Sequence, residues 1–209
     1  MIDEGDAVPR TVALFPLKSV LFPGALLNLK VFEARYLDLV SNCLREQEPF
    51  GVVCIPGAGR ETGRENVQFE PEGVLAHIDE VDAEGPNLLR VRCHGSERFS
   101  IVGQADQQSD GLWTAQVQTL PADEVVTPEP ALFPTVQALQ QVIASLREQQ
   151  GHSPFAEPYA LDDAGWVANR WCEVLPIPLA ARQKLMMLPD PQTRLRLVHE
   201  YLKGKGVVQ

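Results

Sequence analysis

Apolar and polar residues alternate in short segments up to about Leu120, and turn residues separate these segments. The alternation is clearest over Leu89–His94 and Trp113–Gln118. A period of two is typical of half-buried antiparallel strands. Residues 50–55 form a continuous apolar run instead, which predicts a strand buried on both faces. Turn residues over 82–87 and 103–111 predict breaks between strands.

One helix is predicted inside this strand-rich part, over Glu33–Gln47. Apolar side chains recur there at helical spacing, which indicates that one face of the helix lies on the sheet. Phe32, just before the helix, is expected to pack on Leu37 as a hydrophobic staple. The apolar face is predicted to consist of Tyr36, Leu37, Val40, Cys43 and Leu44.

After residue 121 the apolar period changes to that of helices. One helix is predicted over 132–146 and one over 163–174, where Asp162 or Asp163 is expected to be the N-cap. A third begins at Pro178 and runs to Leu188, and a fourth follows Asp190 and ends at Gly204. The sequence therefore predicts an α+β fold: a β-rich lobe with one helix (1–120), then a small all-α helical-bundle lobe (121–209).

Charge and composition narrow the function. Residues 1–120 carry 10 Lys/Arg against 18 Asp/Glu, so we expect no nucleic-acid binding through phosphate contacts. The acidic N-terminus lacks the features of a signal peptide, and no apolar stretch is long enough to cross a bilayer. The four cysteines show no C-x-x-C pairing and are expected to be buried thiols. These features predict a soluble cytoplasmic protein with no membrane association.

The sequence contains no common catalytic or cofactor motif, such as G-x-S-x-G, H-E-x-x-H or a phosphate loop. The glycine cluster at 57–63 lacks the phosphate-loop lysine and is expected to be a loop. Cys93 and His94 are neighbours on a predicted strand, so their side chains should point to opposite faces, with Cys93 buried. The four histidines are far apart in sequence, never at metal-ligand spacing. We therefore expect no catalytic residue, no cofactor and no metal.

Two motifs near the N-terminus carry a resemblance. Leu14–Gly24 reads LFPLKSVLFPG and Leu29–Tyr36 reads LKVFEARY. Together they resemble the opening signature of the LON domain, the substrate-binding domain of Lon proteases. Further similar segments are FGVV at 50–53, GVLAHI at 73–78, RVRCHGSERF at 90–99, DAGW at 163–166, QKLMML at 183–188 and RLRL at 194–197. The resemblance spans roughly residues 10–203 and implies a PUA-like, partly closed barrel as the β lobe.

In Lon proteases this region precedes an ATPase domain and a Ser/Lys protease domain, whose motifs are missing from this sequence. The resemblance therefore implies a free-standing recognition module that binds polypeptide segments in a groove between lobes and catalyses nothing. Two alternatives remain: an RNA-binding PUA-like protein, and an adaptor that docks one folded partner. The sequence leaves the oligomeric state open.

The signature residues have both a structural and a binding interpretation. The aromatic side chains of Phe15, Phe22, Phe32 and Tyr36 are expected to pack where helix meets sheet. Glu33 near the helix start is expected to pair with Arg35. The candidates for direct contact with a bound peptide are Phe22, Phe32, Glu33 and Tyr36.

Overall fold

The computed structural model describes residues 8–57, 67–150 and 153–209. They form two compact units: a strand unit, from the described residues within 8–23 and 27–121, and a helical unit, from those within 24–26 and 122–209. Apart from Gly57, the glycine cluster at 57–63 lies outside the described residues. Among the described residues, no helix combines the length and apolar character needed to cross a bilayer.

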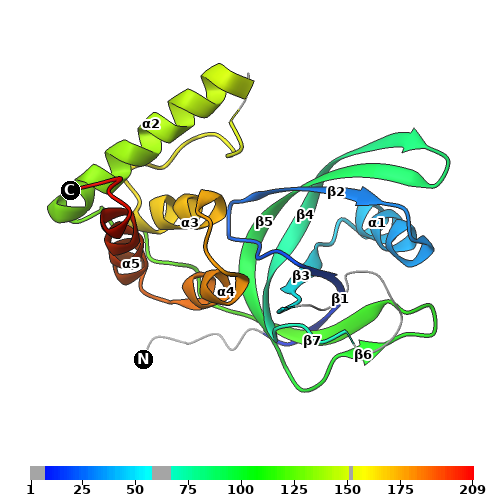
Figure 1. The fold of residues 1–209 in the computed structure, drawn as a ribbon. Coiled ribbons are helices and arrows are strands. Elements are labelled where there is room, and N and C mark those ends of the chain that lie inside the picture. Colours follow the sequence, from blue (N-terminus) through cyan, green and yellow to red (C-terminus); the bar gives the residue numbers. More distant parts are fainter. Residues whose placement is uncertain (1–7, 58–66, 151–152) are drawn as a thin grey trace. The chain divides into compact units, whose positions relative to one another are not determined.

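The strand unit is built on a mixed sheet of seven strands in the order β2-β5-β4-β3-β1-β7-β6. β1 and β3 are parallel, whereas β3 with β4, β4 with β5, and β1 with β7 are antiparallel. A further antiparallel pairing of β5 with β7 closes five of the strands into a ring, so the predicted pseudo-barrel is confirmed (Figure 1). The strands are β1 (Arg10–Leu17), β2 (Leu26–Val31), β3 (Phe50–Cys54), β4 (Glu72–Gly85), β5 (Leu88–Ile101), β6 (Asp106–Gln107) and β7 (Trp113–Thr119).

The ring encloses an apolar core in which Phe99 is fully buried. Gly73 makes room for this ring, because a Cβ atom there would lie 2.7 Å from Phe99 Cζ and 2.2 Å from the Val52 carbonyl oxygen. β3 is buried along its whole length, as its continuous apolar run predicts. The other core residues of the ring are Val12, Leu14, Val53, Leu75, Ala115 and Val117.

One helix, α1 (Ala34–Glu46), belongs to the strand unit and has Glu33 and Gln47 as its caps, in agreement with the predicted span. Its buried face contains Tyr36, Leu39, Val40 and Cys43. The prediction for Leu44 is wrong, since this residue is 50% exposed. Leu39 takes its place because it lies three residues after Tyr36 and four before Cys43, on the same side of the helix.

Two predicted breaks differ from the observed strands. The turn expected over 82–87 is shorter, because β4 continues to Gly85 and β5 begins at Leu88. Cross-strand ion pairs accompany this extension: Arg92 lies against Glu80, and Arg90 Nη2 is 3.5 Å from Asp82 Oδ2. The break expected over 103–111 contains the short strand β6. Polar residues that look like a turn in sequence thus continue β4 and β5, with exposed charge pairs across this hairpin.

The helical unit contains η1 (Pro130–Leu132), α2 (Phe133–Gln150), α3 (Ala164–Val174), α4 (Leu179–Met187) and α5 (Pro191–Gly204). The predicted N-caps are present: Asp163 accepts a hydrogen bond from the Gly165 amide at 3.0 Å, and Asp190 accepts one from the Thr193 amide at 2.9 Å. α3 packs against α5, and Leu195, Val198 and Leu202 are buried as predicted. Four α-helices therefore follow the strand unit, which confirms the α+β class.

Candidate functional site

A pocket of about 210 Å³ lies in the strand unit between β2, the end of β1 and the start of α1. β1 contributes Phe15–Leu17, β2 contributes Asn28–Val31, and the connection to α1 contributes Phe32 and Glu33. β2 is the terminal strand of the sheet, with β5 as its neighbour on one side. The pocket therefore adjoins a strand whose second edge has no partner strand among the described residues.

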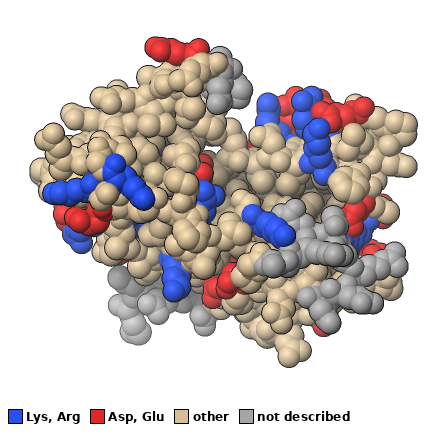
Figure 2. Space-filling view, in the orientation of Figure 1, with Lys and Arg blue, Asp and Glu red and all other residues tan. Residues whose placement is uncertain are grey.

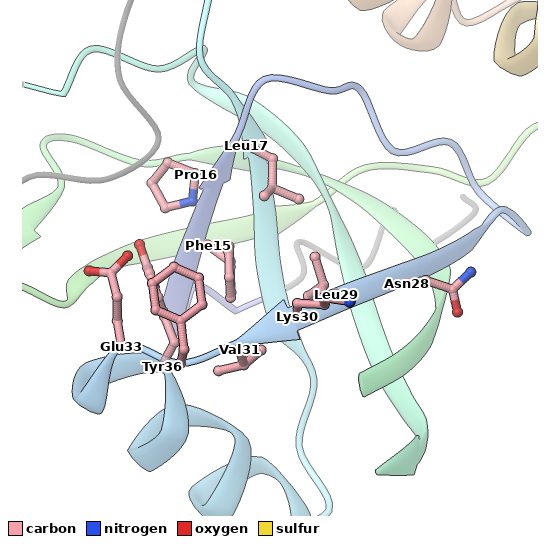
Figure 3. A pocket seen from close by; sticks show the side chains of 10 residues that line it. Phe15, Pro16, Leu17, Asn28, Leu29, Lys30, Val31, Glu33 and Tyr36 are labelled. Atoms are coloured by element: carbon pink, nitrogen blue, oxygen red, sulfur yellow. The ribbon is translucent and has the colours of Figure 1, made fainter. Parts of the chain in front are cut away.

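The walls of the pocket are mainly apolar. Phe15 stacks on Tyr36 with ring centroids 4.0 Å apart, and both rings are buried (Figure 3). Leu29 and Val31 are also buried, so every second residue of β2 turns its side chain inward. Phe32 is different: it lines the pocket but is 59% exposed. The pocket thus combines a rigid aromatic wall with one solvent-exposed phenyl ring.

Polar contacts fix the N-terminal end of α1. Arg35, which is buried, donates from Nη2 to Glu33 Oε2 at 2.7 Å and from Nη1 to the Gly111 carbonyl oxygen at 2.9 Å. The guanidinium also lies 4.8 Å from the centroid of the Tyr36 ring. Burial raises the pKa of the Tyr36 phenol above its usual value, so the ring stays neutral at ordinary pH. The predicted pairing of Glu33 with Arg35 is confirmed, and it orders the backbone beside Phe32.

Three of the four candidate contact residues come together in this pocket. Phe32, Glu33 and Tyr36 all line it, whereas Phe22 is fully buried and is not among its lining residues. The core prediction is confirmed for Phe15, Phe22 and Tyr36 but is wrong for Phe32. Because Leu29 and Val31 point inward, the alternation of β2 leaves the even positions outside, and Phe32 continues that outward series.

Sequence reasoning missed the apolar wall itself. Phe15, Leu29 and Val31 line the pocket, yet in sequence they are ordinary inward residues of two strands. The alternation within β2 identifies Leu29 and Val31 as buried, but it does not indicate that Phe15 and the end of β1 lie opposite. That neighbourhood depends on how the sheet curls, which the alternation does not specify.

Among the described residues, no group of side chains has the arrangement of a metal site. Cys93 is fully buried and His94 is half exposed, so the two point to opposite faces as predicted. The structure does bring His77 and His94 together, with ring centroids 5.4 Å apart, and His94 Nδ1 lies 2.7 Å from Asp79 Oδ1. Even so, no group of three or more His, Cys, Asp or Glu side chains in the described chain could hold a metal ion.

Comparison with known proteins decides the family. The model of the ATP-dependent protease La (LON) substrate-binding domain matches residues 11–204. The chain belongs to the LON substrate-binding domain family. This LON domain is similar to a Lon N-terminal domain protein from Xanthomonas campestris, whose crystal structure has a TM-score of 0.73, 29% identity and coverage of 92% of this chain and 98% of that one.

Other relatives are more distant. The N-terminal domain of a Lon protease of the Mycobacterium avium complex has the same fold, with a TM-score of 0.59, 15% identity and coverage of 93% of this chain and 98% of that one. Lon protease of Anaeromyxobacter dehalogenans is 22% identical and Lon protease 2 of Myxococcus xanthus is 24% identical, each over 98% of this chain. The LON domain spans only 24% and 25% of these two proteins.

Proposed function

We propose that this LON domain is a non-catalytic, cytoplasmic module that binds exposed apolar segments of polypeptides at the pocket beside Phe32. Family membership supports a substrate-binding role in general, because the matching model is that of a substrate-binding domain. The proposal adds the location and the chemistry: an apolar side chain enters the pocket, while the extended backbone follows the free edge of β2.

The observation that carries this proposal is the exposure of Phe32. Phe32 lines an apolar pocket and is 59% exposed, and exposed aromatic side chains of this kind are enriched at protein–protein interfaces. The ring sits on an ordered support, since the Glu33–Arg35 ion pair and the buried Tyr36 fix the residues that follow it. Strand addition at an edge supplies main-chain hydrogen bonds, and the pocket supplies preference for an apolar side chain.

The test is a fluorescence-anisotropy titration with fluorescein-labelled, reduced and carboxymethylated lactalbumin, which stays unfolded. Phe32→Ala should weaken binding about fivefold to tenfold, equivalent to about 1–1.4 kcal/mol. Phe133→Ala is the matched control, because Phe133 is also an exposed phenylalanine, 46% exposed, but belongs to the helical unit. Equal affinity of Phe32→Ala and wild type would refute the location of the site.

Anisotropy titrations with short RNAs and with unfolded lactalbumin separate the alternatives. An RNA-binding protein would bind short RNAs with an affinity that falls steeply as salt rises. The strand unit gives no support for this at the β4–β5 hairpin, where acidic and basic side chains are intermingled (Figure 2). An adaptor for one folded partner would ignore unfolded lactalbumin.

A further inference from the structure

A second groove in the strand unit lies along the first residues of β1. β1 pairs with β7 from Arg10 to Leu14, but its pairing with β3 begins only at Leu14. Within the described residues, Arg10–Ala13 therefore have a strand partner on one side alone. An open strand edge of this kind is a template for another extended backbone.

The backbone of Thr11 faces this open edge. Opposite residues of an antiparallel pair either exchange both of their hydrogen bonds or neither of them. Gln116 stands opposite Thr11, and its carbonyl oxygen accepts instead from the Val102 amide at 2.8 Å, on the far side of β7. Thr11 and Gln116 are therefore a non-hydrogen-bonded pair. The amide and the carbonyl of Thr11 point away from β7, toward the groove.

The groove has room for a short segment of chain. Its volume is about 340 Å³, with β1 as one wall and the second half of α1 as the other. Its apolar lining comprises Val12, Ala13, Leu39, Cys43, Pro49 and Leu112. All of these belong to the strand unit, and none of them lines the pocket beside Phe32.

Two glutamates and two arginines lie at the rim of the groove. Glu46 and Glu48 line it with side chains 61% and 64% exposed, against a single lining cation, Arg10. Arg10 Nη1 lies 3.4 Å from Glu48 Oε2, and Arg45, just outside the lining, has its Nε 2.8 Å from Glu46 Oε1. α1 also ends here, and the C-terminal end of a helix carries a partial negative charge. The formal charges at the rim balance, so the preference comes from the helix end and from the excess of Asp/Glu over Lys/Arg in residues 1–120, which together favour a segment with positive side chains over an acidic one.

We propose that this groove is a second binding site, which accepts an extended, basic polypeptide segment that pairs with Thr11 and directs lysine or arginine toward Glu46 and Glu48. An alternating sequence fits both requirements. Its small apolar side chains face the lining, and its basic side chains reach the carboxylates. This site operates independently of the pocket beside Phe32, so the two proposals succeed or fail separately.

The first experiment tests the backbone pairing with a labelled peptide of alternating lysine and valine. Thr11→Pro removes the outward amide without removing a bond to β7, and proline is tolerated at strand edges. Thr11→Val is the matched control: both variants lose the hydroxyl that accepts from Gln116 Nε2 at 2.6 Å, but valine keeps the amide. Thr11→Pro should bind about tenfold more weakly than Thr11→Val. Equal affinities overturn the proposal.

Hydrogen exchange tests the same pairing without a mutation. The amide of Thr11 should exchange rapidly in the free protein and slow down at least about tenfold when the lysine–valine peptide is bound. The amide of Val12, which faces β7, should stay protected in both states. An unchanged exchange rate at Thr11 in the saturated complex overturns strand pairing, even if the proline variant fails to fold.

The second experiment tests the charge preference. The double variant Glu46→Lys/Glu48→Lys should weaken binding of the lysine–valine peptide about tenfold or more at low salt. Glu200→Lys, an exposed change in the helical unit, is the control and should have little effect. A glutamate–valine peptide should bind wild type at least about tenfold more weakly than the lysine peptide. Equal binding of both peptides, or an unaffected double variant, contradicts the proposal, and Phe32→Ala should leave this affinity unchanged.

Discussion

Gly24, the last residue of the motif Leu14–Gly24, allows a quantitative test of how this motif stabilises the fold. Its φ of +75° lies in the left-handed region, where a residue with a Cβ atom is strained. A Cβ atom at this position would lie 3.0 Å from Arg170 Nη1. The same nitrogen donates to the Gly24 carbonyl oxygen at 2.9 Å, and Arg170 is only 1% exposed. A side chain at residue 24 therefore faces a buried guanidinium that has little freedom to move away.

The expected cost has two parts. The left-handed backbone costs a residue with a Cβ atom about 1–2 kcal/mol. Displacement of Arg170 weakens a hydrogen bond to a charged group, which contributes about 1.5–3 kcal/mol when intact. Partial loss of that bond brings the cost of Gly24→Ala to about 2–4 kcal/mol. Gly24→Val should cost more, because a β-branched side chain adds clashes with its own backbone.

Gly206→Ala provides the reference. Gly206 has a similar φ of +71° and belongs to the same helical unit, but nothing lies within 4 Å of its Cβ position. Its substitution should therefore cost only the backbone part. In urea unfolding followed by circular dichroism at 222 nm, Gly24→Ala should destabilise by about 1–2 kcal/mol more than Gly206→Ala. Equal losses would refute the role assigned to the Arg170 contact.

Three further predictions concern buried groups. Tyr36→Ala should lower the free energy of unfolding by about 3–5 kcal/mol in urea titrations, whereas Tyr36→Phe should cost under about 1.5 kcal/mol because it keeps the stacked ring. Burial raises the pKa of every cysteine thiol to about 11 or 12, so Ellman's reagent at pH 8 should label no thiol in the native protein and four in denaturant. Rapid labelling of a native thiol would contradict this. Burial likewise raises the pKa of Glu173 to about 7, above its ordinary 4.5. Folding thus favours protonated Glu173, and this contribution to the free energy of unfolding is fully present below about pH 4.5 and lost as pH rises through about 7. Glu173→Gln should remove this pH dependence from the free energy of unfolding.

Local features of the sequence were sufficient to predict individual elements. The span of α1 follows from its apolar spacing, and the start of α5 follows from Asp190 and Pro191, which cap the helix as predicted. Closure of the sheet into a ring depends instead on the pairing of Phe99–Ile101 with Val117–Thr119. Nothing in the alternation of either segment specifies its partner strand, so the pseudo-barrel was predicted only from the family resemblance.

The candidate sites depend on such pairings even more strongly. His77 and His94 are far apart in sequence, yet they stand opposite each other because β4 and β5 form one hairpin. The open edge at Thr11 likewise results from the register of two neighbours, since β3 begins opposite Leu14. Composition and motif spacing carry no information about where a ladder begins. Both features could therefore be recognised only once the strand registers were known.

The segment Phe32–Tyr36 separates structural and binding roles over five residues. Tyr36 and Arg35 are buried and fix the start of α1, the first by stacking on Phe15 and the second through Glu33 and the Gly111 carbonyl. Phe32 is exposed and contributes little to the core. The two variants should therefore behave differently. Tyr36→Ala should lower stability, and any loss of binding should follow that loss of stability. Phe32→Ala should lower binding while the free energy of unfolding stays unchanged within about 0.5 kcal/mol. A Phe32→Ala protein that unfolds as readily as Tyr36→Ala would mean that the phenyl ring supports the fold, and the polypeptide site would then have to lie elsewhere on the strand unit.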